Sequence, residues 1–336
     1  SALIGGSSVL VIAVGIVRTK IMALLLGPTG FGLMALYSSI VDVVMSVAGM
    51  GVGQSGVRQI ADANGSGEQA RIATTITVLR RLSVWLGIIG GILLVVFSPQ
   101  VSALTFGSEA RTAAVALLAL AVLIRVVNAG QAALVQGLRR IGDLALMGVY
   151  GALLGALASI ALVFVLGEEG IAPSVVAIAG ATLLVSWWYS RRVRIETPDL
   201  PVPVVREEAG SLLKLGFAFM ASGFLMMGSA YAVRAIVLQA EGLDAAGFYQ
   251  AAWTLGGLYV TMILQAMGAD FYPRLTAAAR DDRLTNRLVN EQAHVSMLMA
   301  APGVVATLVL APLLMVLFYT SEFDAAAGVL RWICLG

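Results

Sequence analysis

The sequence predicts an all-α polytopic membrane protein, and its composition, the spacing of its apolar stretches and its charge distribution each support that fold class. Of its 336 residues, 59% are hydrophobic and only 12% are charged. A soluble domain of this size needs a charged shell around its core, and this composition cannot supply one. The composition therefore argues against a water-soluble enzyme, a disordered chain or a nucleic-acid-binding protein.

Apolar stretches with the length of a membrane-spanning helix follow one another along the chain. A helix needs about 20 mostly apolar residues to cross the hydrocarbon core. Nine stretches meet this requirement and a tenth begins: 3–26, 33–57, 82–105, 112–136, 144–166, 171–190, 212–239, 246–269 and 294–318, then 326 onward. The tenth is not completed by Gly336, so we expect a protein of twelve helices, of which about ten are present in this fragment.

The links between the spans differ in charge from one side to the other. The links after the odd-numbered spans are short and contain one cation, Arg111. The links after the even-numbered spans contain 15 of the 21 lysines and arginines: Arg58, Arg71, Arg80, Arg81, Arg139, Arg140, Arg191, Arg192, Arg194, Arg206, Lys214, Arg274, Arg280, Arg283 and Arg287. Cytoplasmic loops carry an excess of Lys and Arg. The basic links, and with them the N-terminus, are therefore predicted to be cytoplasmic.

The seventh span resembles the first. Residues 14–39 can be aligned with residues 231–255, which places Arg18 on Arg234 at an offset of 216. A repeat that begins after six spans is parallel, because an even number of crossings restores the starting side of the membrane. We therefore expect two similar six-helix bundles with a binding site between them near the membrane midplane.

The expected domain boundaries follow from this repeat. The N-terminal six-helix bundle is predicted to occupy residues 1–195, and the C-terminal bundle, which is truncated, residues 211–336. Residues 196–210 form the predicted cytoplasmic linker, because the prolines in this part of the chain favour an extended rather than a helical backbone.

Four cations fall inside predicted spans, although a charge at the bilayer centre costs about 2.5–3.5 kcal/mol. They are Arg18, Lys20, Arg125 and Arg234, whereas Asp42 is the one acid well inside a span. Ion pairs within the spans therefore cannot neutralise the excess. A cationic interior suits an anionic ligand, and the planar arginine guanidinium matches phosphate oxygens.

Arg125 is the strongest candidate for a binding residue because it lies near the centre of its span. At about 100° per residue, Asn128, Gln131 and Gln136 lie on the same arc of the helix. Such a polar face lines a cavity or another helix rather than lipid. We favour a cavity, and the alternative is an interhelical hydrogen-bond network.

The other charged candidates have simpler explanations that stay open. Arg18 and Lys20 could extend along their span to the outer interface, and Arg234 is similarly peripheral, although its alignment with Arg18 favours a shared role. Asp42 could bind a proton or a sodium ion in a coupling or gating role. It could equally be a structural partner for Arg18.

The sequence contains none of the motifs expected of an enzyme or a metalloprotein. The single cysteine, Cys334, and the single histidine, His294, exclude an internal disulfide and a Cys/His metal cluster. No phosphate-binding loop of the form G-x-x-x-x-G-K-[ST] occurs. We therefore expect no catalytic residue, no metal, no cofactor and no nucleic-acid partner.

Three segments resemble those of bacterial polysaccharide-unit flippases. Residues 19–32 are similar to their first-helix and turn signature, residues 272–276 to the segment after helix eight, and residues 321–323 with 329–332 to the junction of helices nine and ten. In order and spacing, the whole chain resembles the Wzx-type O-antigen and enterobacterial-common-antigen flippases. These belong to the multidrug/oligosaccharidyl-lipid/polysaccharide (MOP) superfamily.

This resemblance implies two six-helix bundles in a V, around a cavity that opens to one side at a time. It implies that a polyprenyl-diphosphate-linked oligosaccharide, such as an O-antigen repeat unit, moves from the cytoplasmic to the periplasmic leaflet of the bacterial inner membrane. The positions that fit diphosphate-binding cations are Arg18, Lys20, Arg125 and Arg234. The implied partners besides this substrate are the lipid bilayer, a polysaccharide polymerase and a chain-length regulator.

Two other functions fit parts of the pattern. A cation-coupled multidrug exporter of the same superfamily would bind cationic drugs through intramembrane acids, for which Asp42 is the one candidate. A membrane enzyme, or a membrane scaffold of polysaccharide assembly, would need a large loop, and the visible links are short. In a flippase, cavity polar groups such as Asn128 and Gln131 would contact the glycan.

Overall fold

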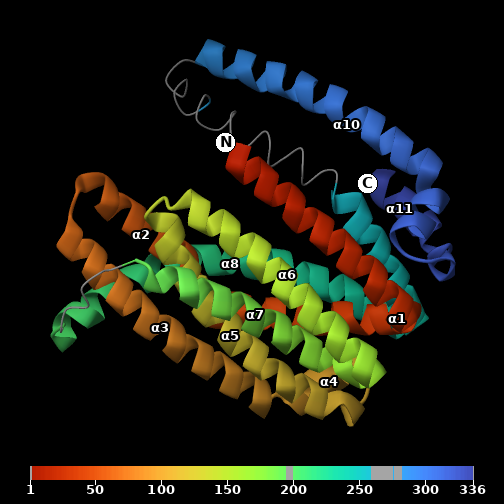
Figure 1. Ribbon diagram of the computed structural model, residues 1–336, viewed down its shortest axis with the longest axis horizontal. Coiled ribbons are helices and arrows are strands. Elements are labelled where there is room, and N and C mark those ends of the chain that lie inside the picture. Colours follow the sequence, from red (N-terminus) through yellow and green to blue (C-terminus); the bar gives the residue numbers. More distant parts are fainter. Residues whose placement is uncertain (1, 194–199, 259–274, 276–281, 336) are drawn as a thin grey trace. The chain divides into compact units, whose positions relative to one another are not determined.

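A computed structural model describes residues 2–193, 200–258, 275 and 282–335 of the chain. In these residues the regular structure is helical and no strand occurs. The chain divides into two compact units, Ser1–Ala246 and Gly247–Gly336, and Figure 1 shows the helices that belong to each. The predicted all-α architecture is therefore confirmed for the described residues.

The first helix, α1 (Ala2–Ala48), contains the first predicted span and most of the second, and it bends at Gly27. Gly27 has φ 61° and ψ −171°, a conformation that is essentially restricted to glycine. The following residue, Pro28, lacks the N–H that a continuous helix needs and disfavours helical geometry in the residue before it. The link predicted at 27–32 is therefore a kink at one residue, with helix on both sides.

Two of the predicted spans are interrupted in the structure. The span predicted at 33–57 breaks after Ala48, where Met50 and Gly51 have φ angles of 44° and 60°, before α2 (Val52–Ser66) begins. The span predicted at 82–105 breaks at Phe97, which separates α3 (Gln69–Val96) from α4 (Ser98–Phe106). Hydrophobicity alone does not show these breaks, because the chain stays largely apolar across them.

The next three helices agree with their predicted spans to within a few residues: α5 (Thr112–Gly137), α6 (Ile141–Leu166) and α7 (Ile171–Arg191). The main buried core of the first unit lies where the second half of α1 packs against α5 and α7, and it includes Tyr37, Leu118, Val122 and Val175. This core fixes the faces of α1 and α5 that carry the candidate site.

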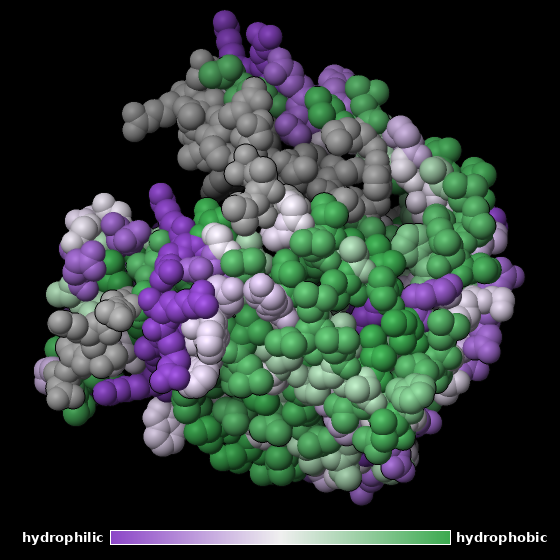
Figure 2. Space-filling view, in the orientation of Figure 1, coloured by the Kyte–Doolittle hydropathy of each residue, from purple (hydrophilic) through white to green (hydrophobic). Residues whose placement is uncertain are grey.

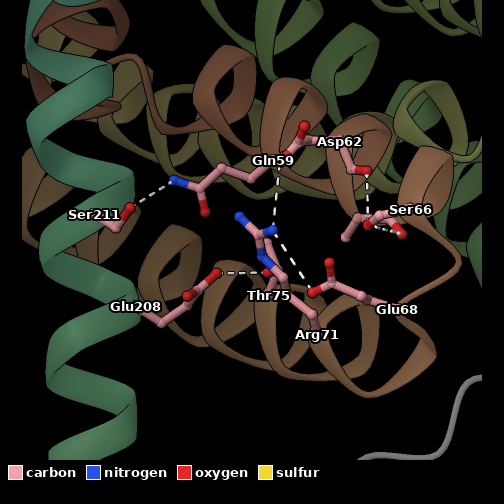
Figure 3. A network of polar contacts seen from close by, with 9 residues as sticks. Gln59, Asp62, Ser66, Glu68, Arg71, Thr75, Glu208 and Ser211 are labelled. Carbon is pink, nitrogen blue, oxygen red and sulfur yellow. Dashed lines mark hydrogen bonds and ion pairs between the residues drawn. The ribbon is translucent and has the colours of Figure 1, made fainter.

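The long helix α8 (Val202–Glu241) packs along α1 and α2 within the first unit. Near its N-terminus, Thr75 of α3 donates to Glu208 at 2.5 Å and Gln59 of α2 donates to Ser211 at 3.1 Å (Figure 3). Near its C-terminus, two hydrogen bonds join it to α4: Thr105 with Tyr231 at 2.6 Å, and Gln239 to the Leu104 carbonyl at 2.7 Å. Polar contacts therefore hold α8 at both ends.

Close backbone packing adds to these contacts. A Cβ atom added to Gly51 would lie 2.2 Å from the carbonyl oxygen of Gly216 on α8. Because α8 packs in this way, the boundary between the compact units follows Ala246 and does not fall in the linker predicted at 196–210. The prediction that this linker is extended is wrong from Val202 onward, where α8 begins, because a proline is tolerated in the first turn of a helix. The division of the sequence into two repeats stays a prediction.

The second unit contains helical residues 247–258, α10 (Asp282–Phe318) and α11 (Ala326–Leu335). Buried Tyr319 donates a hydrogen bond to the Ala251 carbonyl at 3.1 Å. The predicted spans at 294–318 and from 326 correspond to α10 and α11. Residues 259–269 of the eighth predicted span, and all of the 272–276 motif except Leu275, lie outside the described residues.

The surface of the described helices suits a lipid environment. In the described residues, six helical segments are long and apolar enough to cross a membrane. One of them, 141–191, contains two predicted spans, and another, 6–48, contains most of the first predicted span and part of the second. Large apolar side chains are exposed along these segments, including Trp85 and Phe164 at 64% and 74%. Figure 2 shows apolar residues over much of the visible face. Lipid tails solvate such surfaces, whereas water does not.

Candidate functional site

An ion pair between two helices lies at the centre of the candidate site. Nη1 of Arg125, on α5, lies 2.7 Å from Oδ1 of Asp42, on the second half of α1. The two side chains are 35% and 34% exposed. One interpretation of the sequence makes Arg18 the structural partner of Asp42. That pairing is wrong, because the carboxylate of Asp42 forms its ion pair with Arg125.

One cavity, the Arg18 cavity, lies between α1, α5 and α7 and has a volume of about 480 Å³. Its polar lining residues are Arg18, Ser38, Asp42, Arg125, Asn128 and Thr182. The structure therefore brings together three of the predicted binding residues, Arg18, Arg125 and Asn128, and places Asp42 beside them. The sequence preference for a cavity at Arg125 agrees with this geometry.

A second cavity, the Gln54 cavity, has a volume of about 410 Å³ and lies between α1, α2, α3, α5 and α8. Its polar lining residues are Asp42, Ser46, Gln54, Ser83, Arg125 and Gln136. The Arg125–Asp42 pair lines both cavities, so the two adjoin at this ion pair. A ligand group that reached Arg125 would have access to polar side chains on both sides.

The guanidinium of Arg18 is held by neutral groups. Its Nε donates to the Ser159 hydroxyl of α6 at 3.1 Å, and its Nη2 lies 3.9 Å from the sulfur of Met34. Within the described ranges, Arg18 makes no ion pair. Its positive charge is therefore oriented without being neutralised, which is the arrangement that a phosphate-binding arginine needs.

The polar face of α5 divides between two roles. Arg125 and Asn128 line the Arg18 cavity, and Gln136 lines the Gln54 cavity. Gln131 instead accepts a hydrogen bond from the Ser186 hydroxyl of α7 at 2.9 Å and lines neither cavity. The cavity interpretation therefore applies to Arg125, Asn128 and Gln136, whereas the interpretation as an interhelical hydrogen bond applies to Gln131.

Two other predicted binding residues lie elsewhere. Lys20 and Arg234 line neither cavity, and Nη1 of Arg234 donates to the Ala230 carbonyl of its own helix at 2.9 Å. Lys20 follows Arg18 by two residues, which is about 200° around a helix. The two side chains therefore leave α1 on opposite faces.

Sequence reasoning missed four polar residues of this site, of which two are Thr182 in the Arg18 cavity and Ser83 in the Gln54 cavity. Ser159 is the hydroxyl that holds Arg18, and Gln54 lines the second cavity. A buried serine within the strongly apolar α6 is a detectable signal. The signal at Gln54 is weaker, because this residue lies in the polar helix α2, which follows the apolar part of the second predicted span.

A model of the family described as "Polysaccharide biosynthesis protein" matches residues 21–328. The chain belongs to this family. The resemblance of the sequence to polysaccharide-unit proteins is therefore confirmed at the level of the family. No curated protein matches this chain.

Solved structures similar to this chain include transporters of the MOP superfamily. An inward-facing multidrug resistance MATE family transporter matches with a TM-score of 0.77 and 18% identity, over 95% of this chain and 75% of that chain. An outward-facing one matches with a TM-score of 0.66 and 17% identity, over 99% and 75%. These likenesses confirm the predicted fold class.

A MOP superfamily transporter from Pyrococcus furiosus is also similar, with a TM-score of 0.64 and 17% identity over 98% of this chain and 74% of that chain. For that transporter, a reversed polarity of the binding pocket is taken to suggest a different function.

Proposed function

We propose that this protein is a flippase for polyprenyl-diphosphate-linked oligosaccharide, an O-antigen or similar repeat unit. It moves its substrate from the cytoplasmic to the periplasmic leaflet of a bacterial inner membrane by alternating access, with its N-terminus in the cytoplasm. One observation carries the proposal. Two arginines and one aspartate line the Arg18 cavity within an apolar helical bundle, so the charge of the lining is net positive.

The family supports the substrate class, because its description names polysaccharide biosynthesis. The cavity supports the chemical group that is held. A guanidinium carries five N–H donors in a planar fork that matches the oxygens of a phosphate. Arg125 and Arg18 line the same cavity, so both can contact a diphosphate placed there.

In this proposal the substrate diphosphate displaces the carboxylate of Asp42 from Arg125. A diphosphate carries more charge than a carboxylate and accepts more hydrogen bonds, so it competes well for the same guanidinium. Arg18 supplies a second contact, and Asn128, Ser38 and Thr182 offer polar groups to the sugars. The polyprenyl tail stays in lipid. The geometry supports Arg18, Arg125 and Asn128 for this role and gives no such support to Lys20, Gln131 or Arg234.

Replacing Arg125 by Ala tests the proposal in a strain that lacks the chromosomal gene. Surface polysaccharide should be lost while the protein is still present in the membrane fraction. Arg81→Ala, which removes an exposed arginine outside both cavities, should restore surface polysaccharide fully. Wild-type levels with Arg125→Ala would overturn the assignment.

A double variant separates transport from structure. Arg125→Gln together with Asp42→Asn removes both charges of the ion pair while it keeps two hydrogen-bonding side chains of similar size. If Arg125 only stabilises the bundle by pairing with Asp42, this double variant should be active. If Arg125 binds the diphosphate, the double variant should be as inactive as Arg125→Ala.

A cation-coupled multidrug exporter is the second candidate, because Asp42 lines both cavities and the similar structures include multidrug transporters. In the structure, however, Arg125 already occupies the carboxylate of Asp42. Drug susceptibility of a deletion strain distinguishes the candidates: an exporter predicts increased sensitivity to cationic drugs, and a flippase predicts a loss of surface polysaccharide.

A further inference from the structure

A third cavity, the Arg58 cavity, lies at the end of the first unit that the positive-inside pattern places in the cytoplasm. Its volume is about 660 Å³. Side chains from α2, from the turn between α5 and α6, and from α8 line it: Arg58, Gln59, Ala61, Asp62, Gly65, Ser66, Arg139 and Leu215. Its two arginines belong neither to the proposed binding site nor to the polar contacts of α8.

Most of the polar groups in this cavity already have partners. Gln59 donates to Ser211 at 3.1 Å, and Asp62 forms an ion pair with Arg71 at 3.3 Å. The Ser66 hydroxyl bonds the carbonyl of Asp62 at 3.3 Å. Figure 3 shows these contacts together, with Arg71 and Asp62 facing one another. The acid in the lining is therefore paired with an arginine outside it, Arg71, which also lies 3.7 Å from Glu68.

Two exposed guanidinium groups remain in the lining. In the part of the chain that the structure describes, the side chains of Arg58 and Arg139 have no hydrogen bond and no ion pair. They approach the same cavity from different elements, α2 and the α5–α6 turn. The lining therefore holds two cations without partners and one acid, Asp62, that is already paired with Arg71, and this arrangement favours an anionic ligand.

The backbone at Arg139 fixes where its side chain leaves the turn between α5 and α6. Arg139 has φ 56°, a left-handed conformation in which glycine or asparagine is usual and arginine is not. This conformation ends α5, because the N–H of Arg140 bonds the Val135 carbonyl at 3.0 Å in the turn that Arg139 makes. Here the unusual residue contributes one of the two partnerless cations.

The three cavities follow one another along two helices. On α5, Arg125, Ala129, Ala132 and Gln136 line the Arg18 or the Gln54 cavity, and Arg139 lies in the turn that follows this helix. On α2, residues 53, 54 and 57 line the Gln54 cavity and residues 58, 59 and 61 the Arg58 cavity. An anion bound at Arg58 and Arg139 is therefore adjacent to the cavities at Arg125.

We propose that the Arg58 cavity is a loading site, which captures the diphosphate headgroup of a lipid in the cytoplasmic leaflet before it reaches Arg125. This inference rests on the proposed flippase function. Cations at the mouth of a binding site mainly raise the association rate, whereas buried partners mainly set the dissociation rate. The loading site and the central site therefore have different kinetic signatures.

The experiment measures binding kinetics with the full-length protein in detergent, with farnesyl diphosphate and inorganic pyrophosphate as probes. Arg58→Gln with Arg139→Asn removes the two cations, and Asn suits the left-handed backbone at 139. We expect this variant to bind farnesyl diphosphate about tenfold more slowly than wild type. Its dissociation rate should change by less than about twofold. Arg125→Gln should mainly raise the dissociation rate.

Two controls isolate the cavity from general surface charge and from folding. Arg81→Gln with Arg206→Gln removes the same number of exposed cations from the same predicted face but from outside the cavity, and should leave the association rate within about twofold of wild type. Arg58→Lys with Arg139→Lys keeps both charges and should retain at least half of the wild-type association rate.

The outcomes are distinguishable. If the Arg58→Gln, Arg139→Asn variant associates as fast as the surface control, the loading site is wrong and the central site stands. If pyrophosphate shows the effect and farnesyl diphosphate does not, the cavity binds a soluble anion and the lipid-loading role is wrong. If wild type binds neither probe, the flippase proposal itself fails.

Discussion

Arg125 and Arg18 reach the same cavity with different electrostatic surroundings. Arg125 is paired with a carboxylate at 2.7 Å, whereas Arg18 is oriented by a serine hydroxyl and a methionine sulfur. Arg18 is therefore ready to accept an anion, and Arg125 must first exchange one anion for another. This difference makes Asp42 a competitor of the substrate at Arg125.

Asp42→Asn should therefore tighten diphosphate binding. An ion pair that is about one-third exposed contributes about 1 kcal/mol, so removing the competing charge should lower the Kd for farnesyl diphosphate about fivefold. Equilibrium binding to the purified protein measures this, with Ser46→Ala as a control in the Gln54 cavity lining that leaves the ion pair intact. Weaker binding by Asp42→Asn would show that the carboxylate positions Arg125 rather than competing for it.

The sequence predicted the cavity residues of α5 well and the partners of Asp42 poorly, for one physical reason. Periodicity within a helix places Arg125 and Asn128 on one arc, and that arc does line a cavity. Which cation meets Asp42 depends on how two helices are rotated against each other, and no pattern within one helix contains that information. The same periodicity could have separated Lys20 from Arg18, which leave α1 on opposite faces.

At the scale of the elements, breaks in the helices position the site more than helix lengths do. Met50 and Gly51 end α1 and redirect the chain into α2, so that Gln54 faces a cavity and Arg58 lies beyond it. Apolar stretches predicted α5, α6 and α7 closely, because each is bounded by polar turns. They could not predict breaks inside apolar sequence, where a residue with a positive φ or a close contact with another helix determines where the helix ends.

Gly51→Ala should destabilise the protein strongly. Alanine at a φ of 60° costs about 1–2 kcal/mol, and a Cβ 2.2 Å from the Gly216 carbonyl oxygen adds a clash of about 1–3 kcal/mol. The unfolding temperature in detergent should fall by about 5 °C or more. Gly65→Ala is the matched control, because Gly65 lies within α2 with open space around its Cβ position and alanine favours helix. Equal unfolding temperatures for the two variants would contradict this account of the α1–α2 turn.

At the scale of the whole molecule, the packing of α8 and the sequence repeat assign this helix to different bodies. Its contacts place it in the compact unit Ser1–Ala246, whereas the alignment of Arg234 with Arg18 assigns it to the second predicted bundle. The two assignments are compatible if the contacts of α8 with α2 and α3 belong to one state of a transport cycle. Polar side-chain contacts such as Gln59 to Ser211 suit that role, because water replaces them at little net cost when they separate.

Alternating access then predicts that locking α8 to α2 stops transport. In a Cys334→Ala background, Gln59→Cys with Ser211→Cys replaces two residues now in contact at 3.1 Å, and a short reducible bis-thiol reagent can join them. Transport of lipid-linked oligosaccharide in membrane vesicles should fall to near zero and recover on reduction. The control pair, Arg111→Cys with Glu168→Cys, replaces a 2.9 Å contact inside the predicted N-terminal bundle, and cross-linking it should leave transport intact. Full transport with the α2–α8 cross-link in place would mean that α8 moves with the first bundle, and the boundary between the moving bodies would then follow the compact units rather than the repeat.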